Sequence, residues 1–294
     1  MKTTVNLAAS VLARLKNIAK SKEVTFIEIL TRYAIERTLK RIELSSRANQ
    51  CILKGGCLFT IWNNGYSYRP TMDADLELRG RGDIDSVRDL FREVIAIEPN
   101  EPDALSFDTD TLDVAQIRVD DKYGGVRASV MAYIANVRIR VQFDVGIGDA
   151  ITPAARIGLF PSLLDMSEPR IKIYPKATVV AEKIETIVQR GISNSRMKDY
   201  YDLWILCNDT SLDKVKTALA VKRTFSRRKT PLPTVCPTGL ANEFATNRDK
   251  IVQWESFLHK SRLDNSVPDF PEIIKTIRDF YFDILTRLST PREP

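Results

Sequence analysis

The sequence predicts an α/β (α+β) fold in which helical segments precede and follow a central mixed sheet. Apolar residues recur at helical spacing over residues 10–42, alternate with polar residues over much of residues 112–148, and return to helical spacing beyond residue 175. These patterns define a predicted N-terminal helical segment over residues 1–50, an α/β core over residues 51–160 and a helical C-terminal domain over residues 161–294.

The composition is that of a folded globular protein, because 44% of the 294 residues are hydrophobic and 28% are charged. No apolar run approaches the length of about 18 residues that a transmembrane helix requires, and the N-terminus lacks the apolar stretch of a signal peptide. The four cysteines have no C-x-x-C spacing and His259 is the single histidine, which predicts reduced thiols in a cytoplasmic protein and argues against zinc sites and His-based triads. The net charge of +6 is compatible with a nucleic-acid partner but does not establish one.

The first half of the chain predicts helices that lead into a sheet. The N-terminal pattern breaks near residues 23–25, which predicts two amphipathic helices with basic outer faces. Residues 51–62 predict a strand, a Gly-Gly turn and an apolar helix, followed by a strand within residues 69–80 and a helix over residues 84–97. Three further strands are predicted over residues 112–120, 125–135 and 137–148.

The second half predicts helices over residues 178–191 and 195–207, and a third that begins near residue 212. Residues 222–239, which are rich in proline and basic side chains, are expected to form a loop before two final helices. Five cations crowd its start, namely Lys222, Arg223, Arg227, Arg228 and Lys229. Such a loop could track the phosphates of RNA, and the alternative is a solvated helix end.

Asp73 and Asp75 lie two residues apart in a strand-like run. Alternation places both carboxylates on one face of the strand, roughly 6.5 to 7 Å apart at the backbone. Two like charges so placed repel each other unless a cation lies between them or they reach solvent. Mg²⁺ prefers such hard oxygen ligands, and two-metal sites of this kind serve phosphoryl displacements. The alternative is a strand end at the surface with both acids solvated.

Two further features could belong to the same site. Gly55 and Gly56 separate a strand from a helix, where backbone N–H groups could approach a phosphate, although most such pairs form only turns. Asp144 lies on the polar face of a later predicted strand, where it could complete a metal-binding trio with Asp73 and Asp75. The alternative for Asp144 is an ordinary solvent-facing acid.

The helices after residue 175 carry charges with unusual spacing. Lys183 has no acid three or four residues away, while Glu182 and Glu185 face each other as like charges. Lys183 could therefore contact a triphosphate, or form a salt bridge with a distant element. Asp199 and Asp202 share a helix face, and the alternative to a site is that Arg196 and Lys198 neutralise them.

Together these segments resemble the AbiEii/AbiGii nucleotidyltransferase toxin family over nearly the whole chain. Five segments carry the resemblance in order: the leader SVLARLKNIAK with ILTRYAIERTLKRI, the core LKGGCLF with YRPTMDADLEL, then QFDVGIGDAITP, VVAEKIETIVQRGISNSRMKDYYDLW, and FSRRKTPLP with PTGL and FATN. The resemblance implies the minimal nucleotidyltransferase fold for the core. It also implies an enzyme that transfers a nucleoside monophosphate from an NTP to an acceptor and releases pyrophosphate.

The resemblance further implies roles for individual residues. It places Gly55, Gly56, Arg69, Thr71 and Lys183 at the triphosphate, Asp73 and Asp75 at Mg²⁺ or Mn²⁺ with Asp144 as a possible third ligand, and Asp199 in the chemistry, with Asp202 and Glu182 in support. The candidate RNA-binding residues Arg223, Arg227, Arg228 and Lys229 come from the crowding of basic side chains and not from the resemblance.

The resemblance also implies partners. Toxins of the family are understood to modify the 3′ end of tRNA and to be neutralised by a cognate antitoxin, and no membrane partner is expected. Two alternatives remain from the residues alone: a metal-dependent RNA nuclease, because acids and a lysine also suit phosphodiester cleavage, and a non-catalytic module that binds RNA or a partner protein.

Overall fold

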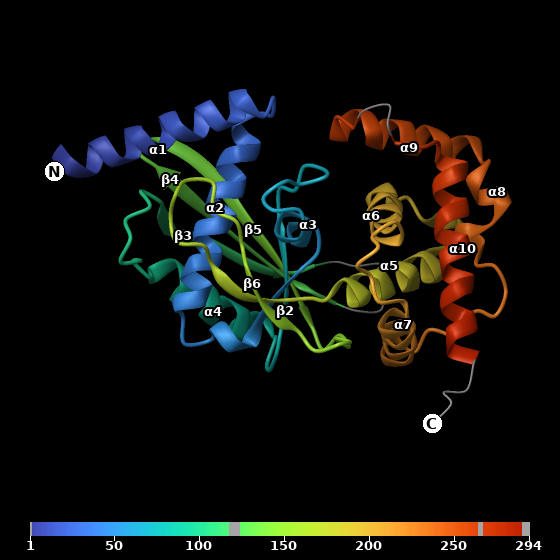
Figure 1. Cartoon of the computed structure of the whole chain (residues 1–294). Helices are drawn as coiled ribbons and strands as arrows, with labels where there is room; N and C mark the ends of the chain where they lie inside the picture. Colours follow the sequence, from blue (N-terminus) through green and yellow to red (C-terminus); the bar gives the residue numbers. More distant parts are fainter. Residues whose placement is uncertain (1, 118–123, 264–266, 290–294) are drawn as a thin grey trace. The chain divides into compact units, whose positions relative to one another are not determined.

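The structure is a computed structural model that describes residues 2–117, 124–263 and 267–289 (Figure 1). The chain divides into two compact units. The first comprises Met1–Gly148 with Arg156–Ile173, and the second comprises Asp149–Ala155 with Tyr174–Pro294. Over the described ranges, no helix combines the length and apolar character needed to cross a membrane. All four cysteines are free.

The first unit is built on a seven-stranded mixed sheet with the order β3-β4-β5-β2-β1-β7-β6. Its strands are β1 (Cys51–Lys54), β2 (Ala74–Leu78), β3 (Ser106–Gln116), β4 (Val126–Ile134), β5 (Val137–Ile147), β6 (Arg156–Leu159) and β7 (Arg170–Ile173). Strand β2 is parallel to β5 and antiparallel to β1, and β1 is parallel to β7. The centre of the sheet is therefore β2, which carries the Asp-x-Asp run.

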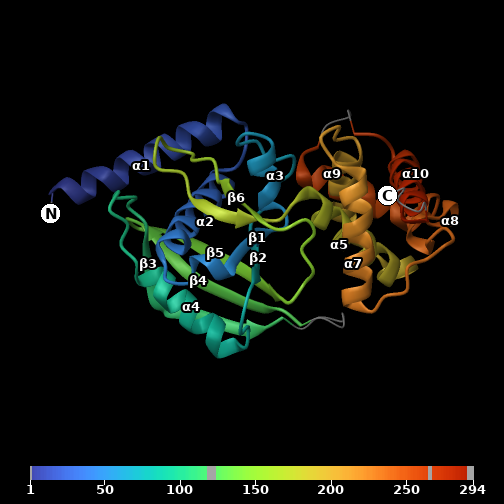
Figure 2. The same ribbon diagram turned by 60° about the horizontal axis from the view of Figure 1, so that its bottom comes forward.

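Among its described residues the first unit has four α-helices: α1 (Lys2–Ser21), α2 (Phe26–Leu44), α3 (Cys57–Trp62) and α4 (Ile84–Ala96). Helices α2 and α4 pack against each other and against the sheet (Figure 2). Phe91 of α4 meets Phe143 of β5 with ring centroids 5.3 Å apart. Because side chains alternate along a strand, the apolar face at Phe143 leaves Asp144 on the opposite face.

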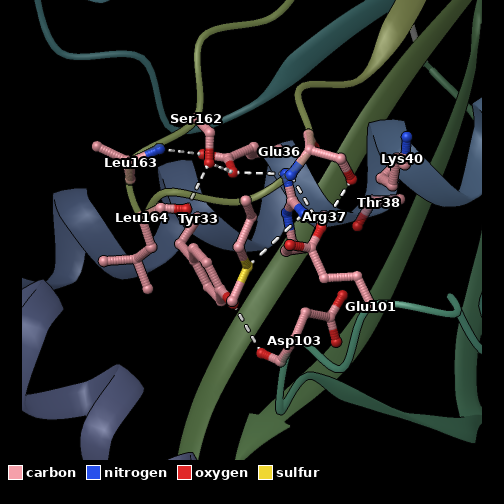
Figure 3. Close-up of polar contacts among 12 residues, drawn as sticks. Tyr33, Glu36, Arg37, Thr38, Lys40, Glu101, Asp103, Ser162, Leu163 and Leu164 are labelled. Atoms are coloured by element: carbon pink, nitrogen blue, oxygen red, sulfur yellow. Dashed lines mark hydrogen bonds and ion pairs between the residues drawn. The ribbon is translucent and has the colours of Figure 1, made fainter.

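Helix α2 departs from its predicted basic outer face, because Arg37 and Arg41 are buried. Arg37 donates to Glu36 at 2.7 Å, and Arg41 donates to Asp103 at 2.5 Å. Figure 3 shows Glu36 and Arg37 beside Ser162, whose hydroxyl donates to Glu36 at 2.8 Å. Burial of these charges is tolerated because each has an opposite charge and hydrogen-bond partners.

The second unit is helical. It contains α5 (Lys176–Arg190), α6 (Met197–Cys207), α7 (Lys214–Arg228), α8 (Asn242–Ala245), α9 (Arg248–Ser261) and α10 (Phe270–Ser289). Its core is aromatic, because Tyr200 packs against Phe244 and Phe270, and Phe270 also packs against Trp254. Ring pairs of this kind contribute beyond the area that they bury.

The predicted elements are confirmed in type with four differences. In the described part of the chain, three α-helices, α8, α9 and α10, follow the basic stretch where two were predicted. Strand β3 begins at Ser106, before the predicted residue 112, and residues 118–120 of that prediction lie outside the described residues. Strands β6 and β7 were not predicted, because four residues each are too short for a clear period. The basic stretch predicted as a loop begins as helix, since α7 continues to Arg228.

Candidate functional site

The glycine pair forms a tight turn between β1 and α3. Gly55 has φ +70°, in the left-handed region that favours glycine. A Cβ built on Gly55 would collide with the carboxylate of Asp75. The Asp75 side chain therefore lies directly against the backbone of the turn, an approach that only glycine permits.

Arg69 and Thr71 lie against the second glycine. A Cβ on Gly56 would stand 3.0 Å from Thr71 Oγ1 and 3.1 Å from Arg69 Nη2. Thr71 Oγ1 is buried and has no hydrogen-bond partner among the described residues. A buried hydroxyl without a partner costs stability unless a ligand or water satisfies it. Four of the residues predicted at the triphosphate therefore lie close together in the first unit: Gly55, Gly56, Arg69 and Thr71.

Asp73 lies immediately before β2, which begins at Ala74. Cys57 Sγ donates to the Asp73 carbonyl at 3.5 Å, so the start of β2 lies beside the start of α3. Burial raises the pKa of the Cys57 thiol well above its usual range, and the charges of Asp75 and Asp73 raise it further. Both carboxylates are therefore close enough to Cys57 to act on its ionisation.

A row of charged residues crosses the centre of the sheet. Arg127 of β4 is opposite Asp144 of β5, Asp144 is opposite Asp75 of β2, and Asp75 is opposite Lys54 of β1. Opposed residues share a face of the sheet, with neighbouring strands about 4.8 Å apart. The register therefore places Asp144 beside Asp75 on one face of the sheet.

Asp144 is held by an arginine. Arg127 Nε donates to one carboxylate oxygen at 2.7 Å, and Arg127 Nη2 donates to the other at 2.8 Å. No group of three His, Cys, Asp or Glu side chains in the described ranges is arranged to hold a metal ion. The structure thus brings Asp144 beside Asp75 but gives its carboxylate an arginine partner.

Lys54, the last residue of this row, also pairs with Glu77, which lies two residues after Asp75 on β2. Lys54 Nζ donates to Glu77 Oε2 at 3.1 Å, and the Glu77 side chain is fully buried. The Lys54 ammonium lies close to Gly146 of β5, because a Cβ built on Gly146 would stand 2.6 Å from Lys54 Nζ. The sequence did not single out Lys54, Glu77 or Arg127, because pairing across strands depends on register.

In the second unit Lys183 lies between two carboxylates. Its Nζ is 2.5 Å from Asp199 Oδ1 and 2.8 Å from Asp202 Oδ2, and Arg196 Nε donates to Asp199 Oδ2 at 2.6 Å. Burial raises the pKa of Asp199, but the charges of Lys183 and Arg196 outweigh burial and hold the pKa far below its usual range. The tertiary salt bridge considered for Lys183 is therefore present.

Arg228 is the centre of another cluster in this unit. It contacts Asp149 at 3.0 Å, Glu185 at 2.7 Å and Glu182 at 3.7 Å. These contacts confirm that the two like-charged glutamates find their partner on another element. The Arg228 side chain is only 13% exposed, whereas Arg223, Arg227 and Lys229 are exposed. Arg228 is thus engaged internally and is not part of the exposed basic surface.

The arrangement in the first unit combines carboxylates, an arginine and a glycine turn, the groups that metal-bound phosphates require. A family model described as "Nucleotidyl transferase AbiEii toxin, Type IV TA system" matches residues 37–276. The match includes the glycine turn, Asp73, Asp75 and the Lys183 cluster, so the protein is of the nucleotidyltransferase class. The chain belongs to the AbiEii family of toxins, which are components of type IV toxin–antitoxin systems.

Two crystal structures from Helicobacter pylori are similar to the chain. JHP933 is 13% identical with a TM-score of 0.47, and the alignment covers 86% of this chain and 89% of that one. A candidate nucleotidyltransferase is 14% identical with a TM-score of 0.48, and the alignment covers 87% of this chain and 94% of that one. Neither similarity bears on the reaction. A comparison with curated proteins finds no match.

Proposed function

We propose that the protein transfers a nucleoside monophosphate from a magnesium-bound NTP to the 3′ end of an RNA, with tRNA as the acceptor. Family membership supports nucleotidyl transfer. The observation that carries the nucleotide site is the unsatisfied Thr71 hydroxyl, buried beside the Gly55–Gly56 turn and the Asp75 carboxylate. A phosphate oxygen would satisfy that hydroxyl.

The first unit supplies the groups that would bind the nucleotide. Asp73 and Asp75 offer the hard carboxylate oxygens that Mg²⁺ or Mn²⁺ prefers. The metal, when bound, neutralises charge on the triphosphate and assists attack on the α-phosphorus. Arg69 and Thr71, both against Gly56, would donate to phosphate oxygens. Together these residues orient the phosphates and stabilise charge that develops in the transition state.

Lys183 and Asp199 are kept in the proposal on the match of their positions to the family. Lys183 would contact the β- and γ-phosphates, and Asp199, whose two oxygens accept from Lys183 and Arg196, would hold the Lys183 ammonium in place. The hydrogen bonds to Asp199 and Asp202 hold Lys183 in one orientation. Because the Asp199 pKa is lowered by its cationic neighbours, Asp199 is an anion at neutral pH and keeps Lys183 charged.

The acceptor would meet the exposed cations at the end of α7, namely Arg223, Arg227 and Lys229. Arg228 is left out of this surface because its guanidinium is used by Asp149 and Glu185. Membership in a type IV toxin–antitoxin family implies a cognate antitoxin as the protein partner.

The proposal is tested by incubating the purified protein with Mg²⁺, total tRNA and each α-labelled NTP in turn. Wild-type protein should label tRNA with at least one NTP, and Asp73→Ala should abolish labelling because one of the two metal carboxylates is lost. Asp110→Ala is the matched control, since Asp110 is an exposed acid of β3, three strands away from β2. It should retain wild-type labelling.

Three results would contradict the proposal. Equal labelling by Asp73→Ala and wild type would show that the site is misassigned. Cleavage of tRNA by wild-type protein without any NTP would identify a metal-dependent nuclease instead. A protein that binds tRNA but neither labels nor cleaves it would be a binding module.

A further inference from the structure

Arg127 of β4 is an arginine whose guanidinium is fixed in place by Asp144 of β5. Its Nε and Nη2 atoms grip both oxygens of Asp144 at 2.7 and 2.8 Å. A bidentate pair of this kind fixes the plane of the guanidinium as well as its position. The orientation of Arg127 is therefore set by β5, the strand next to the Asp73–Asp75 segment.

The guanidinium retains capacity for another ligand. The Arg127 side chain is 43% exposed, whereas that of Asp144 is 20% exposed. Nη1 makes no hydrogen bond to any residue in the described ranges. One edge of the guanidinium, formed by Nε and Nη2, is therefore used on Asp144, and the N–H groups of Nη1 can donate to an anion.

The position of Arg127 is close to the acids proposed to hold metal. It shares a row with Asp144 and Asp75 across adjacent strands. The hydrogen bonds that Arg127 donates to Asp144 raise the Arg127 pKa, desolvation lowers it by less, and the charges of Asp144, Asp73 and Asp75 raise it by smaller amounts. By the register, two strand spacings, about 10 Å, separate Arg127 from Asp75 at the backbone, so the long Arg127 side chain can reach a phosphate bound by the metal.

We infer that Arg127 binds a phosphate oxygen of the nucleotide and that Asp144 is its positioning residue rather than a third metal ligand. This inference rests on the proposed nucleotide site and assigns a residue within it. Arg127 occupies one lone pair on each Asp144 oxygen and neutralises the carboxylate, so Asp144 attracts a metal ion less strongly than an acid without a cationic partner would. Arginine suits phosphate because its planar fork offers several donors at once.

A purely structural pair would behave differently. Partly exposed salt bridges contribute little to stability, about 0 to 1 kcal/mol. A structural role therefore predicts that loss of Arg127 leaves anion binding unchanged. A phosphate-binding role predicts a loss of anion affinity that exceeds any change in stability.

The test measures binding of Mg²⁺-tripolyphosphate and of Mg²⁺-ATP by calorimetry without RNA. Arg127→Gln should weaken binding by about tenfold or more, as expected when a charge-assisted hydrogen bond is lost. Arg127→Lys keeps the charge but not the planar set of donors, so its binding affinity should lie between those of Arg127→Gln and wild type. Arg138→Gln is the matched control, because Arg138 is an exposed cation on the same face of β5, about 20 Å from Asp144 along the strand. It should bind as wild type does.

Asp144→Asn separates a positioning residue from a metal ligand. If Asp144 is a positioning residue, Asp144→Asn should lower the binding affinity but leave the Mg²⁺ concentration for half-maximal binding unchanged. The double variant Arg127→Gln with Asp144→Asn should then bind with the same affinity as Arg127→Gln alone. Thermal unfolding of each variant would verify that it is folded.

Three outcomes are decisive against the inference. Wild-type affinity in Arg127→Gln would remove Arg127 from the site while leaving the proposed function intact. A several-fold increase in the Mg²⁺ requirement of Asp144→Asn would make Asp144 a metal ligand. Absence of binding by wild-type protein would overturn the nucleotide site itself and the inference with it.

Discussion

At the scale of single residues, Gly55 shows why the turn before α3 needs glycine. Its positive φ alone makes any L side chain costly, and Asp75 occupies the space where a Cβ would lie. Two separate constraints therefore act at one position. Only the second of them concerns the site, since it fixes how closely the Asp75 carboxylate approaches the backbone.

Gly55→Ala should lower the free energy of unfolding by about 1 to 3 kcal/mol and should abolish nucleotidyl transfer, because Asp75 must move. Gly65→Ala is the matched control. Gly65 also has positive φ, but a Cβ there would meet Pro161 at an ordinary 3.6 Å. The control should lose similar stability in urea unfolding while retaining transfer. If both variants transfer equally, the contact between Gly55 and Asp75 has no role in the site.

The sequence could indicate individual site residues but not their partners. The spacing of Asp73 and Asp75, the glycine pair and the isolated Lys183 were visible as patterns. The grip of Arg127 on Asp144 could not be predicted, because the two lie on different strands and become opposed only through the register. The same reason hid the pair of Lys54 with Glu77.

At the scale of elements, α5 and α6 are joined by the Lys183 cluster. The side chains of Asp199 and Asp202 are 3% and 2% exposed, so their charges need cations nearby. Lys183 contacts both acids and Arg196 also contacts Asp199. Because the Asp199 pKa is lowered in the fold, its contribution to stability is present above its unfolded pKa of about 3.9 and is lost as the pH falls through the folded pKa.

Lys183→Met should destabilise the protein by about 3 to 5 kcal/mol at neutral pH, since it removes the cation that two buried carboxylates share. It should also raise the Asp199 pKa, so acid unfolding should begin at a higher pH than in wild type. Circular dichroism during an acid titration and urea unfolding measure both effects. Lys198→Met, an exposed lysine of the same region, should change stability by less than about 0.5 kcal/mol. Equal effects of the two substitutions would contradict this role of the cluster.

Long periodic elements were predictable from the sequence, and short or context-dependent ones were not. Helix α4 was predicted over residues 84–97 and spans Ile84–Ala96, because its apolar spacing is regular. Strands β6 and β7 are four residues each and gain stability from neighbours in the sheet. Helix α7 continues through a basic run because Arg228 pairs with Asp149 and Glu185. The helix ends at Lys229, which has the left-handed conformation.

At the scale of the whole molecule, the net charge of +6 is less informative than its distribution. Some cations are consumed internally, as Arg228 is, and others remain exposed at the end of α7. Only the exposed cations can release counterions when RNA binds. The surface available to an acceptor is therefore smaller than the basic run in the sequence indicates.

Replacement of Arg223, Arg227 and Lys229 by glutamine should weaken tRNA binding and flatten its salt dependence. Log affinity falls as log salt rises, and each lost phosphate contact should make this negative slope shallower by about 0.7 to 0.9. Replacement of Arg248, Lys260 and Lys275, three exposed cations of α9 and α10, makes the same change in net charge and should leave the slope unchanged. Filter binding over a salt series compares the two. Equal slopes in the two triple variants would remove α7 from the acceptor surface.

The central claim is that the protein moves the α-phosphate of an NTP, with its nucleoside, onto RNA. The most direct measurement follows α-labelled and γ-labelled forms of the same NTP in reactions with Mg²⁺ and tRNA. The account predicts that the α-label enters tRNA, that the γ-label leaves as pyrophosphate, and that the mass of the tRNA increases by one or more nucleotides. Transfer of the γ-label to tRNA, or release of the α-label without any change in the mass of the tRNA, would contradict it.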